Sequence, residues 1–191
     1  MAMHSEQWFP TVIWSTFLDN VDILELKKFA YDRKRNDIGR TISNVSGYQS
    51  SDIRQNDCTE IDKLVKILNK EIYNCCEQIS FPPLKINNLW ININPPGAYN
   101  LLHNHQGSLL SGVFYVDSTT QHGNIEFERG DNAEYFLPKV IPRQTYFNLY
   151  KATYAARTNA LLIFPSWVKH SVLQNQAKND RISISFNYGL E

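Results

Sequence analysis

The chain has 191 residues, of which 42% are hydrophobic, so it is long enough for one domain of ordinary size with a real core. It carries 19 Lys and Arg residues against 19 Asp and Glu residues, and this balance disfavours a binder of nucleic acid or of an anionic membrane. No stretch has the apolar length that crosses a bilayer and the first residues lack a secretory signal pattern, so we expect a cytoplasmic protein.

The first part of the chain predicts one short strand and two helices that flank a polar loop. Apolar residues recur at helical spacing in two stretches, and Asp19 or Asn20 is placed to cap the first of them. In chain order, the predicted elements are a strand over residues 8–14, a helix over 21–35, a loop over 37–57 and a helix over 60–78.

From Leu84 onward the hydrophobic pattern has the period of a strand. Leu89, Ile91 and Ile93 alternate with residues of other character, and a Pro-Pro-Gly turn follows. Further strands are predicted over residues 100–106, 109–117, 123–128, 145–151, 160–164, 169–174 and 181–188.

This order of elements predicts a mainly β chain with flanking helices, an α+β jelly roll backed by the N-terminal helices. We expect a single domain over residues 1–191, in which residues 1–83 give helical support and residues 84–191 form the jelly-roll core. In such a fold, strands that are distant in the sequence become neighbours, so one site can be assembled from separate motifs.

Three histidines indicate a metal site. His103 and His105 are separated by one residue on a predicted strand, so both side chains point to the same face of the sheet. His170 follows far downstream and reaches the same ion if the strands between them fold back. Imidazole suits iron, zinc, copper and nickel, so these ligands alone leave the metal open. His4 and His122 have no such partners and are interpreted as ordinary surface or hydrogen-bonded residues.

Arg181 and Ser183 share one face of the last predicted strand. A guanidinium on the inner face of a strand is costly to bury without an anion. One partner would be an Asp or Glu of the chain, in an internal salt bridge. The other would be a ligand carboxylate, held bidentately by Arg181 with the Ser183 hydroxyl as an additional donor.

The motifs together resemble the Fe(II)/2-oxoglutarate-dependent dioxygenases. The similarity lies in the order of five motifs along the chain. They are a His-x-His in the place of the family's His-x-acid motif, a strand ending Tyr-Val-Asp, Gly-x-Ile-x-Phe, Phe-Pro with a following His, and Arg-x-Ser. Four blocks also resemble a branch of uncharacterised oxygenases of marine bacteria and phages: residues 47–50, 103–112, 164–167 and 181–187. The resemblance implies a double-stranded β-helix, a cupin-like variant of the jelly roll, in the cytoplasm of a bacterium or of a phage host.

The resemblance also implies an activity and roles for four residues. The activity is oxidative decarboxylation of 2-oxoglutarate to succinate, coupled to hydroxylation of a substrate that the sequence does not identify. Fe(II) would be bound by His103 and His170, and the distal carboxylate of the co-substrate by Arg181 and Ser183. The partners would be the small-molecule co-substrate and an unknown prime substrate, and a homodimer is left open.

The chain departs from the family pattern at two positions. His105 stands where most members have Asp or Glu, so either three histidines bind the metal or an acid from elsewhere completes the site, with Asp117 and Glu126 as candidates. Asn94 stands where many relatives carry Tyr. Tyr99 has the parity of His103 in the strand and is placed to supply the missing hydroxyl.

Two other functions fit the same spacings. A cupin-type metal-dependent oxygenase or isomerase would use the histidines without 2-oxoglutarate, although the glutamate that cupins usually add is missing. A non-catalytic jelly-roll binding protein would tolerate changes at Arg181. For the 2-oxoglutarate-dependent dioxygenase, the walls of the substrate pocket are expected in the loop 37–57 and the segment 129–145.

Overall fold

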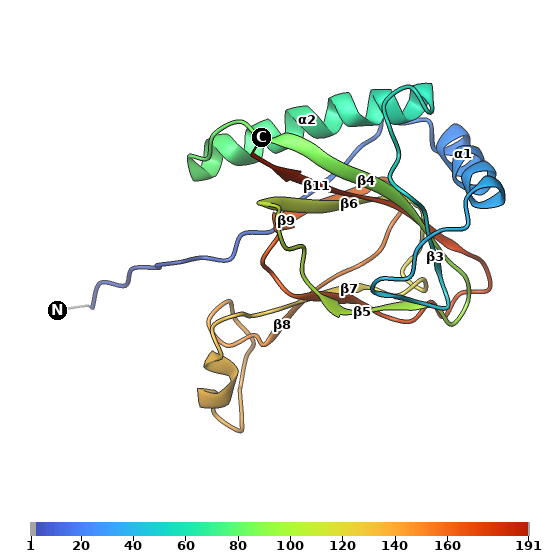
Figure 1. The fold of residues 1–191 in the computed structure, drawn as a ribbon. Helices are drawn as coiled ribbons and strands as arrows, with labels where there is room; N and C mark the ends of the chain where they lie inside the picture. The colour runs from blue at the N-terminus through green and yellow to red at the C-terminus, as the bar shows by residue number, and fades with distance from the viewer. Residues whose placement is uncertain (1–2, 191) are drawn as a thin grey trace.

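Two antiparallel β-sheets face one another in the computed structural model, which describes residues 3–190 (Figure 1). The major sheet has the order β1 (Trp14–Phe17), β9 (Ala160–Pro165), β6 (Leu110–Asp117), β11 (Arg181–Gly189), β4 (Lys85–Asn94) and β3 (Tyr48–Gln49). The minor sheet has the order β2 (Asn44–Val45), β5 (Tyr99–His103), β10 (His170–Val172), β7 (Ile125–Glu128) and β8 (Lys151–Tyr154).

Two helices cover the outer face of the major sheet, α1 (Ile23–Asn36) and α2 (Thr59–Ile79) (Figure 1). The helix α2 is amphipathic, and its apolar stripe is buried against the sheet. The N-cap of α1 is Asp22, whose side chain accepts a hydrogen bond from the backbone N–H of Glu25 at 3.1 Å. The predicted caps Asp19 and Asn20 are therefore wrong, but the predicted jelly roll with supporting helices is confirmed.

The two central strands of the major sheet present different residues to its two sides. In the register of β4 and β11, Ile184 lies opposite Ile91, and Ser183 lies opposite Asn92. The isoleucines belong to the core that the sheet forms with α1 and α2. Asn92 and Ser183 face the minor sheet and line the cavity between the two sheets. The alternation predicted from residue 84 onward thus separates a structural face from a cavity face.

Several predicted boundaries differ from the structure. The first strand is β1, not residues 8–14, because its register is set by pairing with β9. The strand predicted over residues 145–151 is β8, whose four residues pair with β7. The predicted loop 37–57 contains β2 and β3, so this loop adds one strand to each sheet. Short strands of this kind are fixed by their partners rather than by their own pattern.

Between β7 and β8 the chain leaves the sheets in a projection that carries the short 3-10 helix η1 (Ala133–Phe136) (Figure 1). In the described part of the chain, residues 3–190, no helix combines the length and the apolar character needed to cross a membrane.

Candidate metal centre

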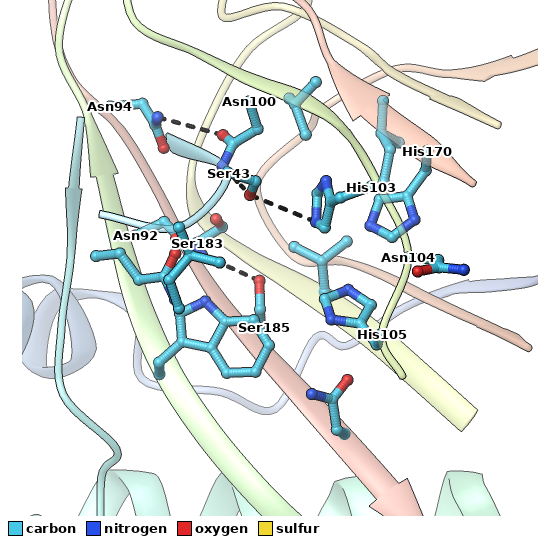
Figure 2. Close-up of a pocket in the computed structure, with 18 of the residues that line it drawn as sticks. Ser43, Asn92, Asn94, Asn100, His103, Asn104, His105, His170, Ser183 and Ser185 are labelled. Atoms are coloured by element: carbon cyan, nitrogen blue, oxygen red, sulfur yellow. Dashed lines mark hydrogen bonds between the residues drawn. The ribbon is translucent and has the colours of Figure 1, made fainter. Parts of the chain in front are cut away.

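A cavity of about 210 Å³ lies between the two sheets and contains the three predicted histidines (Figure 2). His103 is the last residue of β5 and pairs in register with His170, the first residue of β10. His105 lies two residues beyond the end of β5, where its backbone N–H donates to the carbonyl oxygen of Ser166 at 2.9 Å. The predicted strand 100–106 is therefore too long, and a backbone hydrogen bond outside the strand positions His105.

The three imidazole rings converge. Each histidine offers one ring nitrogen, and these three atoms lie within 4.8 Å of one another. The ring centroids of His103 and His170 are 4.3 Å apart, and that of His105 lies 5.1 Å from each of the other two. Figure 2 shows the rings pointing toward one another across the cavity from Ser183 and Ser185. The three ring nitrogens are therefore a group that could hold one metal ion.

Burial keeps these imidazoles neutral. Desolvation lowers the pKa of His170 to about 3 and that of His105 to about 4, with the neighbouring His103 as a second cause, and burial lowers the pKa of His103 as well. The Nδ1 atoms of His103 and His170 lie 2.7 and 3.0 Å from the carbonyl oxygens of Leu101 and Val168. A carbonyl can only accept, so Nδ1 carries the proton and Nε2 keeps the lone pair that a metal needs.

No carboxylate of residues 3–190 joins this cluster. Asp117 forms an ion pair with Lys27 of α1 at 2.5 Å, because β6 directs it toward the helix. Glu126 forms an ion pair with Lys151 of the neighbouring strand β8 at 3.2 Å. Both candidate acids are thus excluded as substitutes. Three neutral, borderline nitrogen donors fit a divalent first-row metal that keeps positions for other ligands.

Arg181 lies in the same cavity and has no anionic partner within the described residues 3–190. It is 2% exposed and begins β11, next to Asn94 in register. Its Nη1 donates to three backbone carbonyl oxygens, those of His122, of Gly123 at 3.4 Å and of Leu173 at 3.3 Å. No ion pair to a described carboxylate satisfies it, so the internal salt bridge is excluded. Burial lowers the pKa of Arg181, yet a guanidinium stays charged in proteins.

Tyr115 is a cavity residue that the sequence analysis missed. It is 1% exposed, lies opposite Ser183 in the register of β6 and β11, and lines the cavity. Burial raises the pKa of Tyr115 to about 12, although the charge of Arg181 acts in the opposite direction. The phenol is therefore a hydrogen-bond donor at neutral pH. The alternation of residues 110–117 shows in the sequence which residues share a face with Tyr115. It does not show that Tyr115 lies opposite Ser183 on the neighbouring strand.

The two residues that were considered for the missing tyrosine differ in position. Asn94 is buried, lines the cavity and donates from Nδ2 to Oδ1 of Asn100 at 3.4 Å (Figure 2). Tyr99 is 36% exposed and does not line the cavity. Between Val172 and His170, β10 advances two residues while β5 advances three, from Asn100 to His103. This bulge reverses the parity of β5, so Asn100 faces the cavity in place of Tyr99.

The loop after α1 forms one wall of the cavity, through Arg40, Ile42, Ser43 and Gln49. Its base is held by Asp37, whose carboxylate accepts from the backbone N–H groups of Gly39 at 3.1 Å and Ser51 at 2.7 Å. Burial alone would raise the pKa of Asp37, but these hydrogen bonds and those from the hydroxyls of Ser51 and Tyr48 lower it to about 2. The segment 129–145, predicted as a second wall, contributes none of its described side chains to the cavity lining.

Comparisons with known proteins agree with this fold. The family described as "Putative 2OG-Fe(II) oxygenase" matches residues 88–187. A prolyl-4-hydroxylase of Pseudomonas putida is similar in structure, with a TM-score of 0.71, 15% identity, and coverage of 95% of this chain and 94% of that one. A viral collagen prolyl hydroxylase of Paramecium Bursaria Chlorella virus-1 has a TM-score of 0.63 and 11% identity, over 93% and 96% of the two chains.

A further similar structure is the epimerase SnoN of nogalamycin biosynthesis, described in complex with Fe3+, alpha ketoglutarate and nogalamycin RO. It has a TM-score of 0.71 and 14% identity, over 94% of this chain and 79% of that one. No curated protein matches the chain significantly in sequence. At these identities the structural likeness establishes the double-stranded β-helix fold, and the family match covers more than half of the sequence. The chain therefore belongs to the 2-oxoglutarate- and Fe(II)-dependent oxygenase family.

Proposed function

We propose that this oxygenase binds Fe(II) through His103, His105 and His170, and 2-oxoglutarate through Arg181, Ser183 and Tyr115, to hydroxylate its prime substrate. The observation that supports this proposal is the presence of three neutral imidazoles and one buried, anion-free guanidinium in a single cavity. When bound, Fe(II) and 2-oxoglutarate supply the oxidative decarboxylation to succinate on which the family relies.

The residues of the chain bind and orient the co-substrate. The guanidinium of Arg181 is suited to a bidentate contact with the distal carboxylate, because its planar fork matches the two carboxylate oxygens. The Tyr115 phenol and the Ser183 hydroxyl stand opposite one another on adjacent strands and add donors to the same end of the cavity. Asn94, beside Arg181 in register, offers an amide there. Ile125, Phe164 and Val172 give the cavity apolar walls that limit access of water.

Three histidines in place of two histidines and a carboxylate change the charge of the centre. Neutral imidazoles leave the full double positive charge of Fe(II) uncompensated. The dianion of 2-oxoglutarate compensates that charge, so its binding is strengthened while the bare metal is held less firmly. Metal retention should therefore depend on the co-substrate more than in a site that contains a carboxylate.

The cupin-type alternative uses the same histidines but gives Arg181 no ligand. A buried guanidinium without an anion is costly, and this favours the 2-oxoglutarate-dependent function. The placement in a branch of marine bacteria and phages, the extent of a single domain over residues 1–191, the cytoplasmic location and a homodimer remain predictions. The prime substrate is not identified by the residues of the cavity.

The test is the visible charge-transfer absorption of Fe(II) chelated by 2-oxoglutarate, recorded without oxygen. The wild-type protein should develop this absorption when both components are added, and His170→Ala should not. His4→Ala is the matched control, because His4 is exposed and lies outside the cluster. If the wild-type protein binds Fe(II) but no 2-oxoglutarate, the cupin-type function replaces the proposed one.

A further inference from the structure

The turn between β6 and β7, residues 119–123, is closed by a buried histidine. His122 is 1% exposed, and its Nδ1 accepts the backbone N–H of Thr119 at 2.8 Å and lies 2.9 Å from the Thr119 hydroxyl oxygen. The backbone N–H of His122 donates to the carbonyl oxygen of Thr119 at 3.0 Å. Side chain and main chain of one residue therefore fix the same turn.

The hydrogen bonds determine the state of this imidazole. A backbone N–H can only donate, so Nδ1 of His122 is unprotonated and the neutral ring carries its hydrogen on Nε2. Nε2 is buried and has no hydrogen-bond partner within residues 3–190. The polar contacts of the ring thus all go to Thr119, and the ring acts on the shape of the turn rather than as a link in a longer network.

The turn presents its carbonyl groups to Arg181. The carbonyl oxygens of His122 and Gly123 both accept from Nη1, together with that of Leu173 at the end of β10. Gly123 has φ +85, and a Cβ there would lie 2.1 Å from the Leu173 carbonyl oxygen, so the turn packs directly on the backbone of Leu173. Three neutral acceptors meet one end of the guanidinium and leave its charge uncompensated.

The contacts of Arg181 are one-sided. Within residues 3–190, the hydrogen bonds of Arg181 all use Nη1, while Nε and Nη2 make none, and the side chain lines the cavity. A bidentate contact requires the plane of the guanidinium to be fixed in advance. We infer that His122 is a positioning residue, which holds the turn 119–123 so that its carbonyl groups orient Arg181 toward the distal carboxylate of 2-oxoglutarate. This inference rests on the proposed function.

The experiment compares two 2-oxo acids on the Fe(II)-loaded protein without oxygen. Both 2-oxoglutarate and 2-oxobutyrate offer the chelating 2-oxo acid group, but only the first has a distal carboxylate. In His122→Leu, which has no acceptor for Thr119, the Kd of 2-oxoglutarate should rise about tenfold while the Kd of 2-oxobutyrate stays unchanged. In His122→Asn, whose amide oxygen can accept the Thr119 N–H, the Kd of 2-oxoglutarate should stay within about threefold of wild type.

Each other outcome has a defined meaning. If wild type binds 2-oxoglutarate and His122→Leu binds it equally well, the inference is overturned and the proposed function stands. If His122→Leu weakens both 2-oxo acids alike, the role is merely structural and the inference is again overturned. If wild type binds no 2-oxoglutarate, the proposed function fails and the inference with it. Should His122→Leu not fold, Thr119→Val removes one contact of the ring and should give a smaller rise, again confined to 2-oxoglutarate.

Discussion

The two faces of the major sheet are built from the same strands but carry different kinds of residue. On the face toward α1 and α2, Ile184 and Phe186 are fully buried among other apolar side chains. On the cavity face, Ser183, Ser185 and Asn187 follow Arg181 along the same strand. Because side chains alternate along a strand, successive residues of β11 belong in turn to the hydrophobic core and to the cavity. Substitutions at neighbouring positions of β11 should have separate effects, and this can be tested.

The largest expected effect is on the helix-facing side. Phe186→Ala should lower the free energy of unfolding by about 3–5 kcal/mol, because it leaves a cavity in a core where a Gly112 Cβ would already meet the Phe186 ring at 2.3 Å. Ser185→Ala, the adjacent control, loses one hydrogen bond from Asn92 and should cost only about 1 kcal/mol. Urea-induced unfolding of both variants measures the difference. Equal losses would contradict the division between the faces.

Acid should act on the cavity through the three imidazoles. Their folded pKa values lie below that of an unfolded histidine, so the unfolded chain binds more protons and the stability of the metal-free protein falls as the pH decreases from about 6.5 to 4. Each imidazole contributes up to about 1.4 kcal/mol per pH unit in this window. Urea-induced unfolding at several pH values measures the slope. His170→Leu should reduce it, whereas His4→Gln should leave it unchanged.

Arg181 is a buried, charged residue of the cavity face, so its effects on stability and on binding should differ in direction. Arg181→Leu should leave the free energy of unfolding unchanged or raise it, because the desolvated charge is removed. The same change should weaken 2-oxoglutarate binding by about 100-fold, the size expected for a buried charge pair that loses one partner. Anaerobic titration of the Fe(II)-loaded protein measures the affinity. Arg181→Lys is the matched control. It keeps the charge but not the planar fork of the guanidinium, so its affinity for 2-oxoglutarate should lie between those of wild type and Arg181→Leu.

The smallest effect is expected at Ser183. Ser183→Ala should raise the Kd of 2-oxoglutarate about fivefold, the loss of one hydrogen bond, and should change the stability little. Competition between 2-oxoglutarate and 2-oxobutyrate on the Fe(II)-loaded variant gives the ratio of their two Kd values, which is then compared with the ratio in wild type. An unchanged ratio would remove Ser183 from the distal carboxylate site and leave Arg181 and Tyr115 as its donors.

The sequence predicted the alternation of β4 and β11, both helices and the histidines that the fold brings together, because period and motif spacing are local properties. It failed where position depends on a partner strand. The bulge in β5 moved Tyr99 out of the cavity, and the register of β6 on β11 brought Tyr115 into it. His105 reached the cluster through a hydrogen bond to Ser166 beyond the strand. Such features follow from long-range pairing, which no local pattern contains.

The cavity wall formed by the loop after α1 is stabilised differently from the sheets behind it, because the Asp37 carboxylate holds its base through hydrogen bonds. The loop that carries Arg40 and Ser43 is closed at its base by hydrogen bonds to this carboxylate and is joined to the two sheets through the short strands β2 and β3. A wall held by one carboxylate at its base and by two short strand pairings can change the side chains between these points while the sheets keep theirs. We therefore expect the substrate range of relatives to vary through this loop, and grafting it between two members, with Asp37 and Ser51 retained, is the direct route to exchanging specificity.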